Sequence, residues 1–129
     1  VIMRMQKTFR DIVKKDGTFI APDDFSEVID NGKAFIDPGV KMGEGWLLTG
    51  EVVSLIKSGV TNVISAQPFG CLPNHIVAKG MVRKIKDEYP KANIVAIDYD
   101  PSASKVNQEN RIRLMLANAK LSEEMKASI

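Results

Sequence analysis

The chain has one cysteine and one histidine among its 129 residues, and only 6% of its residues are aromatic. A lone cysteine, Cys71, excludes an internal disulfide, and the start lacks a charged segment followed by an apolar stretch, so a reducing cytoplasm is expected. No paired-cysteine motif supplies the four thiolates of an ordinary iron–sulfur cluster. No P-loop or dinucleotide fingerprint occurs either, which argues against ATP hydrolysis or a Rossmann cofactor site within these residues.

Long apolar runs and a strong excess of either charge are also missing. Lys and Arg number 18 against 16 for Asp and Glu, and the basic residues are scattered without interleaved aromatics. The chain therefore lacks the clustered basic residues that are typical of a nucleic-acid-binding surface. No segment is apolar and long enough to cross a bilayer. The chain has ordinary globular composition instead, 44% hydrophobic and 26% charged. We expect a soluble cytoplasmic protein without a nucleic-acid or membrane partner.

The two ends of the sequence suggest a piece of a longer protein. The first residue is Val1, with no methionine before it, and residues 123–129 form a polar tail. The length suits one domain. We therefore expect residues 1–129 to be a single α/β domain excised from a longer chain, with residues 1–59 as a helical lead-in and residues 60–120 as two strand-loop-helix units.

The lead-in is expected to contain three helices, whose apolar residues recur at helical spacing. Asp16-Gly17 supplies a stop for the first, and Asp23 or Asp24 can cap the second, with Gly32 at its C-terminal end. The predicted helices cover residues 4–15, 25–31 and 46–57.

From residue 60 the pattern changes to short apolar runs, each followed by an amphipathic stretch. Strands are predicted at residues 62–66 and 94–97, and helices over residues 74–89 and around residues 112–119. Two strands joined through a helix run parallel, so the fold class is α/β: a layered parallel sheet flanked by helices, Rossmann-like without a dinucleotide fingerprint. The predicted core positions are Val63, Ile64, Val77, Met81, Val95, Ile97, Ile112 and Leu116.

Three residues have expected roles at helices of these units. Asn74 is a plausible N-cap of the first, and Ser102 or Ser104 of the second. Gly80, inside the first helix, is expected to let helix and sheet approach closely.

The loop at residues 67–75, Gln-Pro-Phe-Gly-Cys-Leu-Pro-Asn-His, holds the only Cys and the only His of the chain between two prolines. The prolines stiffen the loop, and Gly70 allows a turn directly before Cys71. Cys71 also precedes a predicted helix N-terminus, where the helix dipole favours a thiolate that suits a metal or an electrophile. The alternative is a structural cysteine, since free Cys often packs as a small hydrophobe. His75 alone, with one cysteine, falls short of a closed zinc site.

A second polar loop, at residues 98–104, begins with Asp98 and Asp100. Ligands of open parallel sheets bind outside the carboxyl ends of the strands, so this loop and residues 67–73 are expected side by side. Asp98 and Asp100 can contact a ribose or a metal, or belong to a helix-capping turn. The polar run at residues 107–113 is interpreted as a solvated helix face.

Three segments together resemble one family. They are Gly-Glu-Gly-Trp-Leu-Leu-Thr-Gly-Glu at residues 43–51, the Cys71 loop with Ile76, and Asn-Ile-Val-Ala-Ile-Asp-Tyr-Asp-Pro at residues 93–101. With residues 107–116 they resemble the C-terminal region of the large 2-hydroxyacyl-CoA dehydratase activator-related proteins of anaerobic bacteria, also described as CoA-substrate-specific enzyme activases.

The resemblance implies a role in ATP-dependent, low-potential electron transfer, with ATP bound in another domain of the parent protein. It implies that Cys71 is one thiolate ligand of a [4Fe-4S] or related cluster whose other cysteines lie outside this sequence. Gln67 and His75 would then surround the ligand, with Asp98 and Asp100 in the same crevice. The implied partners are the other domains of the parent chain, a dehydratase subunit or an acyl-CoA.

Two alternatives remain open from the residues. In the first, the loops at 67–73 and 98–104 form a docking or acyl-CoA-binding module and Cys71 is structural. In the second, the chain is a thiol-based enzyme, which requires a general base near Cys71, and only His75 is close in sequence.

Overall fold

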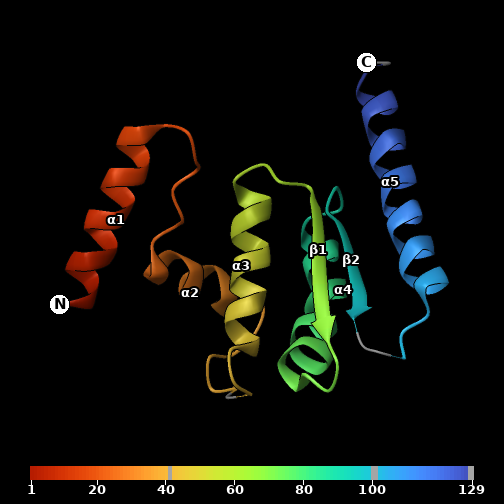
Figure 1. Cartoon of the computed structure of the whole chain (residues 1–129), viewed down its shortest axis with the longest axis horizontal. Coiled ribbons are helices and arrows are strands. Elements are labelled where there is room, and N and C mark those ends of the chain that lie inside the picture. Colours follow the sequence, from red (N-terminus) through yellow and green to blue (C-terminus); the bar gives the residue numbers. More distant parts are fainter. Residues whose placement is uncertain (41, 100–101, 128–129) are drawn as a thin grey trace.

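The computed structural model describes residues 1–40, 42–99 and 102–127. Figure 1 shows the lead-in helices on one side of the molecule, two strands at its centre and a long helix beyond the second strand. The chain has a mixed α/β fold with a small parallel sheet. Its elements are α1 (Ile2–Asp16), α2 (Phe25–Lys33), α3 (Gly45–Lys57), β1 (Asn62–Pro68), the π-helix η1 (Pro73–Ala78), α4 (Lys79–Glu88), β2 (Asn93–Tyr99) and α5 (Lys105–Ala127).

The caps of the first two helices follow from local chemistry, as predicted. Gly17 has a φ of 72° and donates its N–H to the Val13 carbonyl, so it ends α1 in the left-handed conformation. Asp24 precedes α2, and its Oδ1 accepts hydrogen bonds from the Ser26 hydroxyl at 2.6 Å and the Ser26 N–H at 3.0 Å. Its Oδ2 lies 2.9 Å from the Arg10 guanidinium of α1. The Ser26 bonds, followed by the Arg10 charge, hold the pKa of Asp24 below its ordinary value.

The sheet consists of β1 and β2 in parallel pairing, which confirms the prediction from the two strand-loop-helix units. Asn62 pairs with Asn93 at one end of the sheet, and Gln67 pairs with Asp98 at the other. Along β1, Val63 and Gln67 are buried, whereas alternate positions are exposed. Because successive side chains of a strand point to opposite faces, one face of β1 is covered and the other is open.

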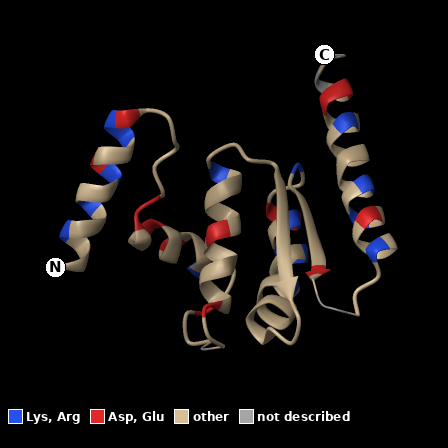
Figure 2. Cartoon of the chain, in the orientation of Figure 1, with Lys and Arg blue, Asp and Glu red and all other residues tan. Residues whose placement is uncertain are grey.

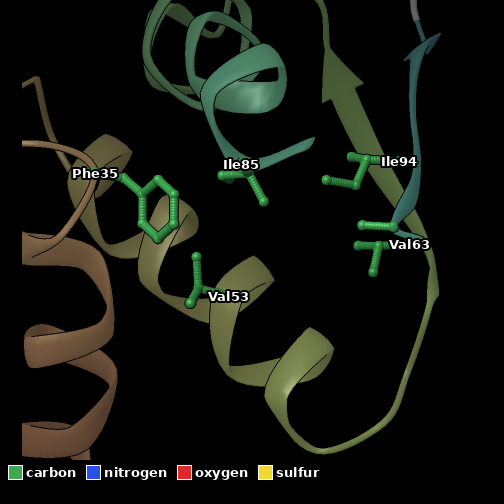
Figure 3. Packing of buried hydrophobic residues seen from close by; sticks show 6 residues of the cluster. Phe35, Val53, Val63, Ile85 and Ile94 are labelled. Carbon is green, nitrogen blue, oxygen red and sulfur yellow. The ribbon is translucent and has the colours of Figure 1, made fainter. Parts of the chain in front are cut away.

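The largest buried cluster joins α3, α4 and the covered face of the sheet (Figure 3). Val53 of α3 and Ile85 of α4 are at most 1% exposed. Full burial of an aliphatic side chain contributes about 1.5–3 kcal/mol, so this cluster is the main apolar link between helices and strands. Its members are Phe35, Val53, Val63, Ile85, Ala92 and Ile94.

Six of the eight predicted core positions are buried or half-buried, and two are exposed. Ile64 is 49% exposed because it lies on the open face of β1, and Leu116 of α5 is 57% exposed. Its neighbour Met115 is buried instead, and Ile112 is half-buried. The side of α5 that packs on β2 therefore contains Ile112 and Met115 and excludes Leu116.

Glycines bring α2 against α3, and this overturns the predicted role of Gly32. A Cβ on Gly32 would lie 3.2 Å from the Trp46 carbonyl oxygen and 3.3 Å from the Cα of Gly50. Gly32 is therefore a close-approach residue inside α2, which continues to Lys33 rather than ending at the glycine.

The expectation for Gly80 is also wrong. It is exposed, and apart from its own helix backbone and chain neighbours no atom of the described residues lies within 4 Å of the position that a Cβ would occupy. The helix that contains it packs on the sheet through Ile85, so no absent side chain is required there.

Across the three described stretches, no helix combines the length and the apolar character that crossing a membrane requires.

The glycine geometry predicts opposite effects for two matched substitutions. Gly50→Ala should lower the free energy of unfolding by about 1–3 kcal/mol, since its methyl group would meet the carbonyl oxygen and side chain of Val28. Gly80→Ala should raise it by about 0.5–1 kcal/mol, since alanine favours an exposed helix interior. Urea denaturation followed by circular dichroism measures both, and equal effects would contradict a tight α2–α3 contact.

The cap on α2 predicts a pH-dependent contribution to stability. The pKa of Asp24 is lower in the folded chain than its ordinary value of 3.8. The ionised carboxylate therefore stabilises the fold at pH values above 3.8, and this stabilisation is lost as the pH falls through the pKa of the folded state. Asp24→Asn should therefore reduce unfolding stability at neutral pH, and the difference from wild type should shrink well below pH 3.8. Asp23→Asn, at the exposed neighbouring position, serves as the control. A deficit that does not change with pH would contradict the charge-based explanation.

Candidate functional site

The Cys71 loop and the end of β2 lie together at the carboxyl edge of the sheet, as the parallel arrangement predicts. The pairs Gln67 with Asp98 and Pro68 with Tyr99 bring the last residues of both strands to one edge. The loop after β1 therefore starts beside the point where β2 ends. Asp100, the other predicted carboxylate, lies outside the described residues.

Cys71 lies in a tight turn immediately before η1. Gly70 has a φ of 67°, a conformation that favours glycine, and the Cys71 N–H donates to the Pro68 carbonyl at 3.2 Å. The thiol is half-buried, and the Asn74 side-chain amide donates to its sulfur with an Nδ2–Sγ distance of 3.0 Å. The loop therefore provides a sulfur atom with a hydrogen-bond donor already aimed at it.

The predicted N-cap role of Asn74 is wrong. The helix begins at Pro73, whose missing N–H is tolerated in a first turn, and Leu72 occupies the N-cap position. Asn74 thus lies inside the first turn, which leaves its amide free to reach Cys71. That turn is π-helical, a rare geometry that is frequent at functional sites.

His75 joins the loop to β2 through both nitrogens of its ring. Nδ1 lies 2.9 Å from the Cys71 carbonyl oxygen, and Nε2 lies 3.2 Å from the Asp98 Oδ1. Both neighbours are acceptors, so only the doubly protonated imidazolium can donate to both. The second contact lacks hydrogen-bond alignment and is an ion pair only when the imidazole is protonated, and both side chains are about one-third exposed. His75 therefore connects the loop to β2 through contacts that do not include the Cys71 sulfur.

Gln67 is fully buried at the end of β1 and ties the strand to η1. Its Nε2 donates to the Asn74 carbonyl at 3.1 Å. Its Oε1 is also buried and has no hydrogen-bond partner among the described residues. A buried oxygen without a hydrogen-bond donor is uncommon in a protein interior. The contact region between β1 and η1 therefore contains an acceptor that is not satisfied by the described residues.

The N-terminus of α3 completes the surroundings of the loop. A Cβ on Gly43 would lie 3.2 Å from the Pro73 ring, and one on Gly45 would lie 2.8 Å from the Val77 side chain. The glycines therefore let η1 pack directly on α3. Residues 43–51 and residues 67–76 therefore contact each other here, and residues 93–101 contact the loop through Asp98.

The polar run at residues 107–113 of α5 has a role that the sequence pattern did not indicate. Gln108 donates to the Asp98 carbonyl at 2.8 Å, and Arg111 donates to the Ala96 carbonyl at 3.0 Å. The interpretation of this run as a wholly solvated face is therefore wrong. Position 108 lies one turn before Ile112 on the packed side of α5, and that spacing was the available signal.

Among its described residues, the site offers one soft ligand and no complete metal centre. Within residues 1–40, 42–99 and 102–127, no group of three or more His, Cys, Asp or Glu side chains could hold a metal ion. Cys71 is the only thiol of the chain. A metal or cluster at this loop would therefore require ligands from other segments.

No known protein family, no curated protein and no solved structure matches the chain.

The contact between His75 and Asp98 predicts a coupling free energy between the two side chains. In a double-mutant cycle with His75→Gln and Asp98→Asn, this coupling should be about 0.5 kcal/mol, because both groups are partly exposed. Urea denaturation of the four proteins measures it.

The more exposed pair of Lys105 and Glu109, whose charged atoms lie 3.7 Å apart, provides the control cycle and should give a smaller coupling. A His75–Asp98 coupling no larger than that of the control would contradict a direct contact between the two side chains.

Proposed function

We propose that this chain is a domain of a 2-hydroxyacyl-CoA dehydratase activator-related protein, and that it supports an iron–sulfur cluster through Cys71. The observation that carries the proposal is the hydrogen bond from Asn74 to the Cys71 sulfur. Hydrogen bonds to the ligand sulfurs are among the features by which a protein sets the potential of such a cluster. A half-buried thiol with its own amide donor suits that role better than a core cysteine does.

The packing of the resembling segments supports the same proposal. Residues 43–51 contribute the glycines on which η1 packs, residues 67–76 form the thiol loop, and residues 93–101 contribute Asp98 beside His75. Segments that are distant in sequence can share a family signature when they build one site. The three segments of this chain contact one another around the Cys71 loop, in agreement with that expectation. The finer architecture, a layered Rossmann-like sheet, belongs to this proposal, with the open edge of β1 available to further strands.

The donor set fits one ligand position of a cluster. Cys71 is a soft donor of the kind that iron–sulfur clusters take, and the remaining thiolates would come from segments outside this chain. When bound, the cluster would supply one-electron transfer at low potential, with ATP used in another domain. Here Gln67 and His75 hold the loop, and Asp98 holds His75. A reducing cytoplasm is the compartment that the proposal implies.

A docking module is the second candidate, and one observation favours it. Four large apolar side chains at this edge are exposed, namely Phe69, Leu72, Ile76 and Tyr99. Exposed apolar groups gathered at one edge are typical of a partner interface. In that case Cys71 is structural, and the partner is a dehydratase subunit or an acyl-CoA. A thiol-based enzyme is less well supported, because His75 contacts the Cys71 carbonyl and Asp98 rather than the sulfur.

The decisive variant is Cys71→Ser in the longer protein that the proposal implies, purified without oxygen. A hydroxyl is a poor substitute for a thiolate ligand, so iron and sulfide per chain and the visible absorbance of the cluster should fall to a small fraction of wild type. Leu72→Ala, at the exposed neighbouring position, is the matched control and should retain both.

Unchanged iron and sulfide in the serine variant would exclude Cys71 as a ligand and favour the docking module. Loss of iron in both variants would show that the loop fold, and not the sulfur, is responsible.

A further inference from the structure

Two adjoining hollows lie away from the Cys71 loop. The first, of about 500 Å³, is formed by residues at the start of both strands and by the last turns of α5. The second, of about 540 Å³, lies between α4 and Ala96 of β2. Lys86 lines both hollows, so they adjoin at that side chain. Each volume is in the range of small-molecule sites.

The hollows carry an excess of positive charge. Their lining contains four cations, Lys79, Arg83, Lys86 and Lys91, and none of these forms an ion pair with any described residue. The first three recur at i, i+4 and i+7, which places them on one side of α4.

The opposing charge in the lining is smaller. Only two carboxylates, Asp87 and Glu123, lie among these cations. Figure 2 shows Lys and Arg on α4 and along α5. Since the whole chain is nearly neutral, the excess is a local feature that attracts anions.

The first hollow also offers apolar surface and amide groups. Leu121 and Met125 of α5 are more than half exposed there, opposite Pro90. Asn118 and Ser122 also line it, and their side chains form no hydrogen bond with any residue of the described ranges. A flat or apolar group could therefore be held between α5 and the residues before β2, with hydrogen bonds to its edge.

We propose that these hollows together form a binding site for an organic phosphate, a small molecule with an apolar or aromatic body joined to a diphosphate. The body occupies the first hollow, and the phosphates lie on Lys86 and Lys91 with Arg83 beyond them. The first hollow is the more enclosed of the two, and its size suits the body of a small molecule better than the surface of an acidic protein. The proposal uses none of the residues around Cys71, so it stands independently of the proposed function.

Calorimetric titration of the chain with adenosine diphosphate tests this site, with pyrophosphate and adenosine as separate probes. Adenosine diphosphate should bind most tightly, and its affinity should fall as salt is raised. Lys86→Gln and Lys91→Gln should each weaken it by about tenfold, because each removes a charge-assisted contact. Lys15→Gln, at an exposed lysine of α1 that pairs with no carboxylate of the described residues, should leave it unchanged.

A substitution that fills the first hollow tests binding of the organic body separately from binding of the phosphates. Asn118→Trp, at an exposed position of α5, should reduce the affinity for adenosine diphosphate to that for pyrophosphate and leave pyrophosphate binding unchanged. Circular dichroism and thermal unfolding check that each variant is folded. No saturable binding of adenosine diphosphate at millimolar concentration, or equal effects of the Lys86 and Lys15 substitutions, would overturn the proposal.

Discussion

The parallel pairing of β1 and β2 is the constraint on which the other features depend. Its register places Gln67 beside Asp98, so the loop after β1 and the carboxylate near the end of β2 meet at one edge. His75 spans that short distance to Asp98. At the other end the same register places Asn62 beside Asn93, and both line the first hollow. The two candidate sites are therefore consequences of one strand alignment.

Periodicity predicted the elements of the fold, because helices and strands bury apolar residues at different repeats. Both strands, their direction and the first four helices were predicted with ends displaced by a few residues, whereas α5 extends well beyond residues 112–119 in both directions. The errors at Gly32 and Gly80 have one cause: a glycine can end a helix, allow close packing or do neither, and only the neighbouring element decides. Ile64 was misplaced for a similar reason, since the pattern of a strand does not tell which of its faces is covered.

The candidate site was predicted in its location and only partly in its contacts. The concentration of Gln67, Cys71 and His75 in one stiff loop indicated the place, and parallel strands brought Asp98 to it. The bond from Asn74 to the sulfur was missed because capping statistics favour asparagine before a helix, whereas Pro73 started this helix one residue earlier. Gln108 and Arg111 were missed because polar residues on a helix are normally solvated, and here they reach carbonyls of β2.

These carbonyl contacts give α5 a further role, because it is the element that reaches both ends of the sheet. Near its start, Gln108 holds the Asp98 carbonyl, and Asn93 at the beginning of β2 donates to the Met115 carbonyl at 2.8 Å. Beyond Met115 the helix continues as one wall of the first hollow. A helix is stiff over this length, rising about 1.5 Å per residue, so its hold on β2 fixes the position of that wall. The same strand carries Asp98, which holds the Cys71 loop through His75. A displacement of α5 along β2 would therefore alter the hollow and the surroundings of the thiol together.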